Sequence, residues 1–220
     1  MNEKIQKSEY KKSAQVKIKL LDTAEELFAE RGFFGVSIRD ITDRATLRSA
    51  SINYHFGTKE NLFLQIINRR IEPLAQARLE KLALINLDVD DKELNTHLLV
   101  EAFAEPMLDF SLNGGAGWRN YCILIAKLAV QKIWSENSVS EKYDSHAQEF
   151  LTSLREIFPE ADDYKIHCAF QFMLSVTLYA VCGNQRIDTL SMGDYKSENF
   201  NEIQTPLFDF ITAGIMRVCQ

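Results

Sequence analysis

The chain has 220 residues, of which 46% are hydrophobic and 25% are charged, and its net charge is −6. These values are typical of a globular protein with a substantial core, and they exclude a chain that is disordered throughout. No stretch approaches the run of about 18 uncharged apolar residues that a transmembrane helix needs, so we expect no membrane partner. The acidic net charge by itself argues against a nucleic-acid partner for the chain as a whole.

The charge is unevenly distributed along the chain. Residues 1–81 contain 15 Lys and Arg against 11 Asp and Glu, a net charge of +4, whereas residues 82–220 contain 10 against 20, a net charge of −10. This asymmetry is expected when one end of a protein faces phosphate groups. Residues 1–13 carry four Lys and few apolar residues, and we expect them to form a basic flexible tail.

The cysteines indicate a reducing compartment. Cys122, Cys168, Cys182 and Cys219 lie in apolar or helical stretches and lack the spacing of a zinc site. The N-terminal sequence has no apolar segment of a secretory signal. We therefore expect four free thiols, no metal and no cofactor in a cytoplasmic protein, rather than disulfides.

Apolar periodicity predicts helices and no strands, so the predicted fold class is all-α. The first helix is expected from Ala14 to Arg31, and a connector helix over residues 58–80 with Pro73 as a kink or an end. Further helices are expected over residues 93–110, 118–134, 141–158, 162–183 and 200–219, with a kink at Pro106 and an interruption or bend near Pro206. Residues 86–92, 113–117 and 184–199 are expected to be breaks or loops.

The stretch from Ser37 to Ala45 predicts a short helix with one apolar side. Ile38, Ile41 and Ala45 stand at i, i+3 and i+7, which places them on one face. Asp40 follows Ser37 by three residues, and this spacing is typical of a capping box at a helix N-terminus.

A second short helix is predicted after a tight turn. Ile52 and Phe56 stand at i and i+4, and Gly57 favours the left-handed conformation that ends a helix. Two such helices form a helix-turn-helix. The outward face of the second helix carries Arg48, Ser49, Ser51, Asn53 and Tyr54, which can form hydrogen bonds with base edges and phosphates in a major groove. Any polar helix face offers such groups, so this pattern alone does not separate DNA binding from solvent exposure.

A wider set of residues resembles the DNA-binding domain of TetR-family transcriptional repressors. The resemblance covers residues 14–70 and is carried by Phe28, Arg31-Gly32-Phe33, Val36-Ser37-Ile38, Asp40-Ile41, Ala45, Ile52, Tyr54-His55-Phe56-Gly57 and Lys59-Glu60-Asn61-Leu62. Two positions depart from the usual pattern: Thr46 stands where the family generally has Gly, and Asn53 stands where an aromatic is commonest. A β-branched Thr46 is expected to strain the turn if its φ is positive.

The resemblance implies a three-helix DNA-binding domain with a helix-turn-helix over residues 14–60, followed by a C-terminal helical bundle over residues 61–220 for effector binding and dimerisation. At matching positions it implies DNA contacts by Ser37, Arg48, Ser49, Ser51, Asn53, Tyr54, His55, Thr58 and Lys59. The helices over residues 162–183 and 207–219 resemble the pair that builds the homodimer interface in this family. A two-turn reading helix contacts few bases and twofold symmetry doubles the contact, which favours a homodimer over a monomer with both helices in its core.

The resemblance also implies an effector pocket among the C-terminal helices. The candidate ligand-binding residues are Phe103, Met107, Trp118, Asn120, Tyr121, His167, Phe170, Gln171 and Met173. Aromatic and Met residues at helical spacing are more often core than ligand site, whereas a buried polar residue needs a partner. The sequence Asn53-Tyr54-His55-Phe56 is similar to that of family members that sense fatty-acyl or other lipophilic compounds.

These features predict a ligand-responsive, DNA-binding transcriptional regulator, a repressor released from a palindromic double-stranded DNA operator by a small lipophilic effector. The alternative is an effector-independent architectural protein that binds DNA with the same N-terminal part. We do not expect an enzyme, because the neighbours His167 and Cys168 point about 100° apart on a helix and cannot form a nucleophile–base pair. The sequence also lacks a Gly-rich phosphate loop after a strand and the spacing of metal ligands.

Overall fold

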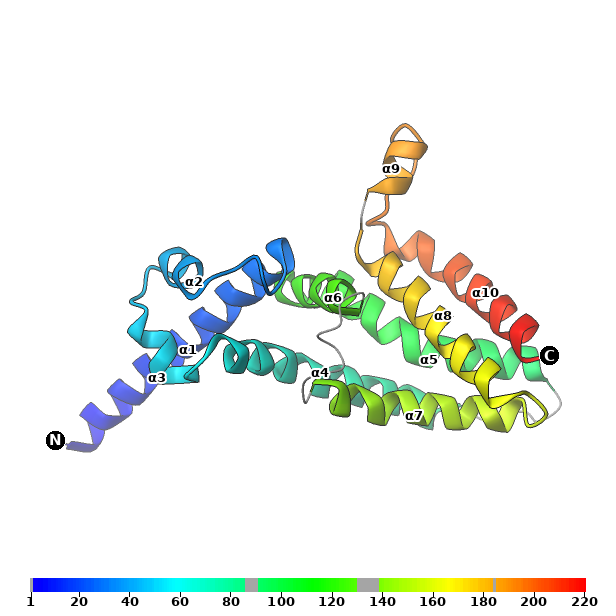
Figure 1. Ribbon diagram of the computed structural model, residues 1–220, viewed down its shortest axis with the longest axis horizontal. Helices are drawn as coiled ribbons and strands as arrows, with labels where there is room; N and C mark the ends of the chain where they lie inside the picture. Colours follow the sequence, from blue (N-terminus) through cyan, green and yellow to red (C-terminus); the bar gives the residue numbers. More distant parts are fainter. Residues whose placement is uncertain (1, 86–90, 130–138, 184) are drawn as a thin grey trace. The chain divides into compact units, whose positions relative to one another are not determined.

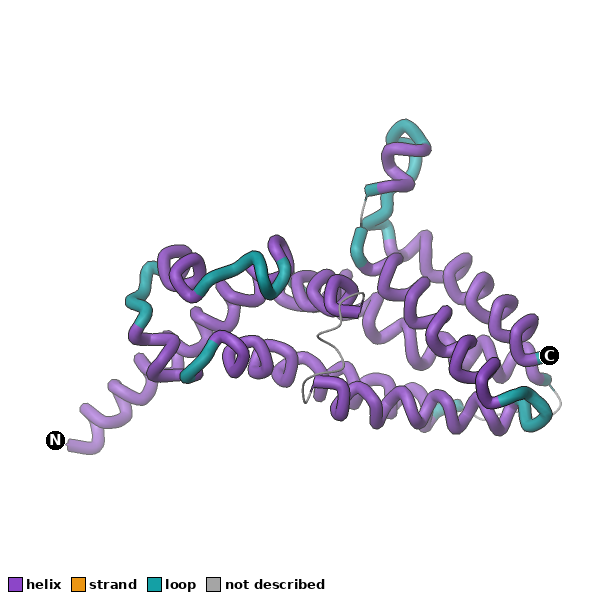
Figure 2. The backbone as a smooth tube through the Cα atoms, in the orientation of Figure 1, coloured by secondary structure: helices purple, strands orange, loops and turns teal. Residues whose placement is uncertain are grey.

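The computed structural model describes residues 2–85, 91–129, 139–183 and 185–220, with the backbone alone for residues 2–6, 8, 9 and 139–145. These residues form helices and no strand, which confirms the all-α fold class (Figures 1 and 2). The chain divides into two compact units, one up to Arg70 and one from Ile71 to Gln220. The division falls inside helix α4 (Lys59–Ala83), which corresponds to the expected connector helix.

Unit 1, the part up to Arg70, contains α1 (Asn2–Arg31), α2 (Ile38–Ala45), α3 (Ala50–Phe56) and the first half of α4. Its core is formed by apolar residues from all four helices, among them Leu20, Leu27, Phe28, Ile41, Ile52, Leu62 and Ile66. The ring of Phe28 packs against the rings of Phe33 and Phe63, with centroids 5.7 and 5.6 Å apart. This core holds the inner sides of α2 and α3.

Helix α1 begins at Asn2, so the predicted start at Ala14 was too late. Residues 2–13 contain neither Gly nor Pro and are rich in Glu, Lys and Gln, which are strong helix formers. The helix ends at Arg31 as predicted, and Gly32 follows with φ of 72°. The N–H of Gly32 donates to the carbonyl of Phe28 over 2.8 Å, which closes the last turn.

Unit 2 is a helical bundle that contains the second half of α4 together with α5 (Lys92–Asn113), α6 (Ala116–Ala129), α7 (Val139–Ile157), α8 (Asp163–Val181), α9 (Arg186–Leu190) and α10 (Phe200–Cys219). Helix α10 packs against both α5 and α8. In the middle of the bundle, the rings of Phe103, Phe150 and Phe170 lie with centroids 5.1 to 5.8 Å apart.

Pro73, Pro106 and Pro206 lie inside α4, α5 and α10, and all three helices continue through them. The predicted end at Pro73 and interruption at Pro206 are therefore wrong, whereas a kink or bend at these prolines stays a prediction. A proline removes one backbone hydrogen bond, but burial of neighbouring residues stabilises the helix, such as Ile71 and Leu74 around Pro73 and Leu207 and Phe208 after Pro206.

The expected loop over residues 113–117 shrinks to Gly114 and Gly115, and the expected loop over residues 184–199 contains α9. The segment after α9 is closed by Asp188, whose carboxylate accepts the Ser197 N–H over 2.8 Å. Most of the expected break at 86–92 and the end of the expected helix 118–134 lie outside the described residues.

Within the described ranges, no helix combines the length and the hydropathy required to span a bilayer. In that same part of the chain, no cluster of His, Cys, Asp or Glu side chains has the arrangement of a metal site. The four cysteines are free thiols.

Candidate nucleic-acid interface and ligand cavity

The capping box at the start of α2 forms as predicted. The N–H of Ser37 donates to Oδ2 of Asp40 over 2.8 Å, and the N–H of Asp40 donates to Oγ of Ser37 over 3.1 Å. The Ser37 hydroxyl also donates to this carboxylate. These hydrogen bonds, first of all that from the Ser37 hydroxyl, lower the pKa of Asp40. Ser37 thus fixes the N-terminus of α2, and a DNA contact by it stays a prediction.

The turn between α2 and α3 contains the strained residue that the departure from the family pattern indicated. Thr46 has φ of 56° and ψ of 45°, the left-handed conformation, and its N–H donates to the carbonyls of Thr42 and Asp43. The left-handed conformation brings the Cβ of a non-glycine residue too close to the following carbonyl oxygen. Thr46 is exposed, so no burial of its side chain compensates for this strain.

Replacing Thr46 by Gly is expected to raise the free energy of unfolding by roughly 0.5–1 kcal/mol, because the relief of left-handed strain exceeds the added entropy of the unfolded chain. Urea unfolding of the full-length protein, followed by circular dichroism, measures the change. Thr46→Ala is the control, since it keeps a Cβ in the strained conformation. A Thr46→Gly protein no more stable than Thr46→Ala would contradict the strain.

Helix α3 presents one apolar and one polar side. Ile52 and Phe56 are buried, whereas Asn53 and Tyr54 are exposed, with Tyr54 79% exposed. Of the other residues predicted to contact DNA, Arg48, Ser49 and Thr58 are exposed, and Ser51, His55 and Lys59 are half-buried. Gly57 ends α3 with φ of 75°. The structure therefore brings the predicted residues together on and around one short helix whose inner side is anchored in the core.

His55 is half-buried near the C-terminal end of α3. Its burial, and secondly the nearby Lys17 cation, lower the pKa of its imidazole. The ring lies between those of Tyr54 and Phe56, with centroids 4.9 and 6.0 Å away. The lowered pKa favours the neutral imidazole, which can contact DNA through a hydrogen bond.

Lys59 has a structural role that the sequence did not indicate. The Lys59 ammonium donates to the carbonyls of Phe33 and Val36 over 3.0 and 2.9 Å and lies 4.2 Å from the centroid of the Phe33 ring. It thereby ties the start of α4 to the loop that precedes α2. An ammonium has three donors, so one is left for a phosphate. Oγ1 of Thr58 accepts the N–H of Asn61 over 3.1 Å and caps α4.

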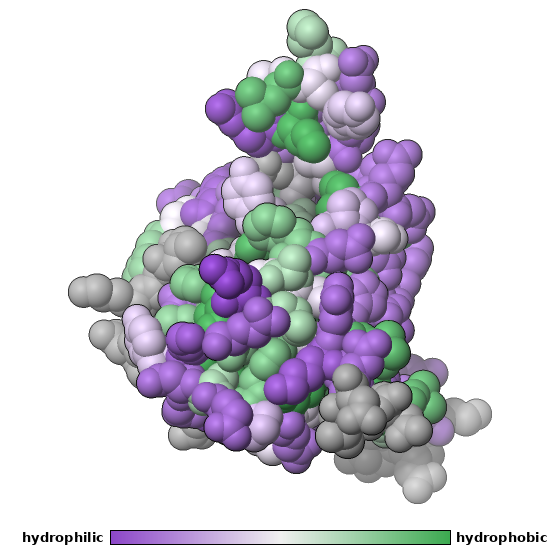
Figure 3. Space-filling model, turned by 90° about the vertical axis from the view of Figure 1, so that its right-hand side faces the viewer, coloured by the Kyte–Doolittle hydropathy of each residue, from purple (hydrophilic) through white to green (hydrophobic). Residues whose placement is uncertain are grey.

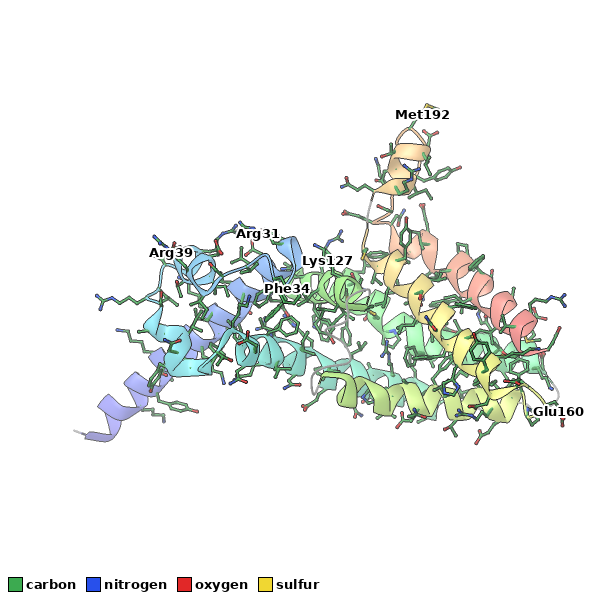
Figure 4. All side chains as sticks on the ribbon, in the orientation of Figure 1. Arg31, Phe34, Arg39, Lys127, Glu160 and Met192 are labelled. Atoms are coloured by element: carbon green, nitrogen blue, oxygen red, sulfur yellow. The ribbon has the colours of Figure 1, made fainter. Side chains whose placement is uncertain are left out.

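The sequence analysis also missed a basic residue on α2. Arg39 points away from the helix into solvent (Figure 4), and its closest acidic partner is Asp43, 3.5 Å away on the next turn. Both side chains are largely exposed, so this ion pair is weak. The sequence offered a signal for an outward-facing Arg39. Arg39 directly follows Ile38 in the helix, so its side chain points about 100° away from the apolar stripe of Ile38 and Ile41.

Unit 2 contains a cavity of about 250 Å³ between α4, α5, α6, α7 and α8. Its lining residues are Leu74, Arg78, Phe103, Met107, Tyr121, Ile125, Ala129, Ala147, Phe170, Leu174 and Leu178. Four of the nine predicted ligand residues are among them, namely Phe103, Met107, Tyr121 and Phe170.

The other five predicted ligand residues do not line this cavity. Trp118 stacks on Phe110 with ring centroids 4.1 Å apart. His167 and Gln171 are exposed on α8, and Asn120 is half-buried elsewhere on α6. Met173 lies in a separate groove between α8 and α10. His167 and Gln171 were chosen as buried polar residues but are exposed, because helical spacing alone does not show which polar residue faces the interior.

Arg78 is the charged residue among the described residues of the cavity wall. It is 5% exposed, its Nε donates to the carbonyl of Phe103 over 2.8 Å, and its guanidinium carbon lies 3.8 Å from the centroid of the Phe103 ring. The sequence carried a signal for it, because Ile71, Leu74 and Arg78 stand at i, i+3 and i+7. Burial, and secondly the Arg78 cation, lower the pKa of His146.

The groove between α8 and α10 is apolar and open to solvent. It is lined by Ala169, Phe172, Met173, Ser175, Val176, Phe210, Ile211, Gly214, Ile215 and Val218. Phe172 and Phe210 are 55% and 68% exposed. Seen from the right-hand side of Figure 1, hydrophobic side chains gather in the middle of the face and on α9 at the top (Figure 3). Helix α9 protrudes from unit 2, with Met192 at the tip of the protrusion (Figure 4).

A polar recognition helix in a helix-turn-helix and a separate helical unit with an internal cavity define a DNA-binding regulator of the all-α class. The family profile described as "Tetracyclin repressor-like, C-terminal domain" matches residues 101–214, about half of the chain. The profile "Bacterial regulatory proteins, tetR family" matches residues 20–66. The chain belongs to the TetR family of transcriptional regulators.

Two relatives show how the similarity is distributed. The chain is 42% identical over 55 residues to the HTH-type transcriptional repressor KstR2 of Rhodococcus jostii, which covers 25% of this chain and 27% of that protein. It is 24% identical over 156 residues to the HTH-type transcriptional repressor BdcR of Escherichia coli, covering 71% of this chain and 72% of that protein. The chain thus spans about a quarter of the length of the first relative. Both relatives are repressors of transcription.

Solved structures share the fold over most of the chain. The ketosteroid transcriptional regulator KstR2 of Mycobacterium tuberculosis matches with a TM-score of 0.64 and 16% identity, covering 90% of this chain and 93% of that one. The transcriptional regulator FadR from Bacillus subtilis in complex with stearoyl-CoA matches with a TM-score of 0.51 and 14% identity, covering 90% and 98%.

Proposed function

We propose that the protein is a homodimeric repressor that reads a palindromic operator with α3 of each subunit and releases it when a small apolar effector occupies the cavity of unit 2. The observation that carries the proposal is the two-sided character of α3. Its inner residues Ile52 and Phe56 are buried, while Arg48, Ser49 and Asn53 are exposed. A helix held this way presents its donors and acceptors to a major groove without losing its core contacts.

We assign the parts of the chain accordingly. Residues 14–60 bind DNA, with the Lys-rich first turns of α1 over residues 2–13 adding basic charge, and residues 61–220 bind the effector and form the dimer. Ser49, Ser51 and Asn53 would contact base edges, whereas Tyr54, Thr58, Lys59 and the newly noted Arg39 would contact phosphates, and Arg48 either.

The apolar groove between α8 and α10 supports the dimer. Phe172 and Phe210 are large aromatic side chains left more than half exposed on neighbouring helices, and Gly214 beside them has open space where a side chain would be. A second copy of the same face would bury both rings by twofold symmetry. Two reading helices per dimer double the number of base contacts.

The cavity favours a ligand-responsive regulator over an effector-independent architectural protein. A ligand changes DNA affinity only if it binds the DNA-competent and DNA-incompetent shapes unequally. Helix α4 belongs to both units: Lys59 at its start holds the loop before α2, and Leu74 and Arg78 on its second half line the cavity. Occupation of the cavity can therefore bias the position of the same helix that supports the helix-turn-helix.

Base reading by α3 is tested by comparing Asn53→Ala with Lys59→Ala. Loss of the Asn53 amide is expected to relax preference at one base pair of each half-site by about 1–3 kcal/mol and to leave other positions unchanged. Lys59→Ala is expected to weaken binding to all sequences alike, because it removes a phosphate contact and releases the loop before α2. Fluorescence anisotropy on a set of labelled operator variants distinguishes the two patterns. Uniform loss with Asn53→Ala would show that its base contact is assigned wrongly.

A further inference from the structure

Helix α1 extends beyond the part of it that unit 1 buries. Among the side chains that the structure describes, the buried ones of α1 begin at Leu20, and the family profile for the DNA-binding part also begins at residue 20. The helix itself begins at Asn2. Figure 1 shows this first part of α1 running past α3 to the N-terminus. We call residues 2–19 the α1 extension, and it lies outside the region that the profile matches.

The α1 extension is strongly basic, although the chain as a whole is acidic. It contains six Lys and two Glu, a net charge of +4, whereas the net charge of the chain is −6. Ion pairs between exposed neighbours on one helix are weak, and pairing of both Glu would still leave four cations. A concentration of positive charge of this kind matches a polyanion.

The lysines of the α1 extension lie on different faces of the helix. Lys7, Tyr10 and Lys17 stand at i, i+3 and i+10, so helical spacing places them on one face. Lys12 and Lys19 stand at i and i+7, and the nine residues from Tyr10 to Lys19 turn the helix by about two and a half turns. These two lysines therefore lie on the opposite face. Lys7, Lys12 and Lys19 are exposed, Tyr10 is 77% exposed and Lys17 is half-buried.

The face of Lys7, Tyr10 and Lys17 begins beside α3, and we call it the α3-side face. Nζ of Lys17 lies 5.8 Å from the centroid of the Phe56 ring, which belongs to the last residue of α3. A helix rises 1.5 Å per residue, so Tyr10 and Lys7 lie about 10 and 15 Å beyond Lys17 along α1. The major groove is about 12 Å wide. When α3 lies in this groove, the α3-side face is long enough to reach the phosphates at its edge.

We propose that the α3-side face of the α1 extension binds the DNA backbone beside the major groove that α3 reads, with the ammonium groups of Lys7 and Lys17 and the hydroxyl of Tyr10 on phosphates. This proposal rests on the proposed function of α3 and adds a second contact surface to it. Phosphate contacts raise the affinity for every sequence and fix the orientation of the protein on the duplex, but they do not read bases. The extension continues a helix that is anchored in the core of unit 1, so little conformational entropy is lost when it binds.

The experiment removes two charges from one face or the other of the full-length protein. Lys7→Gln/Lys17→Gln changes the α3-side face, and Lys12→Gln/Lys19→Gln is the control with the same loss of charge on the opposite face. The probe is a labelled duplex that the wild type recovers from a random pool, extended by about one helical turn on each side. Fluorescence anisotropy at several salt concentrations measures the affinity and its salt dependence.

Lys7→Gln/Lys17→Gln is expected to weaken binding about tenfold or more at about 0.1 M salt. The slope of log affinity against log salt concentration should become shallower by about 1.8 per bound subunit, because each lost phosphate contact removes about 0.9. The control is expected to change the affinity by less than about threefold, since its lysines contribute only through screened long-range attraction. Hydroxyl-radical cleavage of the same duplex should show protected backbone positions at the groove edge that only the α3-side variant loses.

Equal losses in the two variants would overturn the proposal, because they would reflect total charge and not a contact face. An unchanged salt slope in Lys7→Gln/Lys17→Gln would overturn it as well. If that variant has a lowered melting temperature because Lys17 leaves Phe56, Lys7→Glu and Lys12→Glu replace the two double variants with the same expected contrast. A wild type that recovers no common sequence would contradict the proposed function of α3 and this proposal with it. A wild type that recovers a sequence but shows equal losses contradicts this proposal alone, so the two failures are distinguishable.

Discussion

Replacing Glu25 by Ala is expected to lower the free energy of unfolding by roughly 1.5–3 kcal/mol, because the half-buried guanidiniums of Arg69 and Arg70 lose their shared buried carboxylate. Glu25 is 1% exposed and lies in the C-terminal third of α1. It accepts hydrogen bonds from Nη2 of Arg69 over 2.6 Å, and from Nε and Nη2 of Arg70 over 3.1 and 2.9 Å. These contacts connect α1 with α4 within unit 1. Loss of this connection should also abolish operator binding, since the core contacts of α2 and α3 depend on the same packing.

The neighbouring Asp22 provides a matched control. Its carboxylate accepts from Nη1 of Arg69 over 2.7 Å, but its side chain is 59% exposed. Solvent screens this pair, so Asp22→Ala is expected to cost less than about 1 kcal/mol. Urea unfolding followed by circular dichroism compares the two variants with the wild type. A Glu25→Ala protein as stable as Asp22→Ala would contradict the account of the buried network.

Replacing Phe210 by Asp is expected to convert the dimer to monomers and to weaken binding to an inverted repeat by a factor of about 100 or more. A carboxylate at this position would be buried without a partner in the proposed interface between copies. Affinity for an isolated half-site should be unchanged, because α3 lies in the other unit. The ring of Phe210 is 68% exposed within one subunit, so the fold of the monomer should be little affected.

Sedimentation velocity at micromolar concentration measures the change in association. Leu112→Asp is the control, since Leu112 is an exposed apolar residue of unit 2 that does not line the groove between α8 and α10. It is expected to remain dimeric. A Phe210→Asp protein that sediments as a dimer would remove this groove from the interface.

The features that sequence reasoning predicted well are set by residues close together in the chain. The start of α2 depends on Ser37 and Asp40, three residues apart, and the end of α3 depends on Gly57 with its positive φ. The strain at Thr46 could be anticipated for the same reason, because a tight turn limits the conformation of one residue. The buried sides of α2 and α3 follow from the spacing of Ile41, Ile52 and Phe56.

The features that sequence reasoning missed depend on contacts between distant residues. Glu25 and Arg70 are 45 positions apart, and Lys59 and Val36 are 23 apart, so no local pattern indicates that they meet. For the cavity, the aromatic residues Phe103, Tyr121 and Phe170 were predicted, but Arg78 was not. Its charge suggested a solvent-facing position, although its place in the apolar stripe of α4 pointed to the interior.

The central claim, that this TetR-family protein reads a twofold-symmetric operator with α3, is tested most directly by selecting bound DNA from a random pool with the full-length protein. The account predicts that the recovered sequences share two half-sites in inverted orientation, with centres about 34 Å apart, one helical turn, or a small multiple of it. Asn53→Ala should recover the same spacing with one position of each half-site relaxed. Recovery of no common sequence, or of a single element without an inverted partner, would contradict the claim.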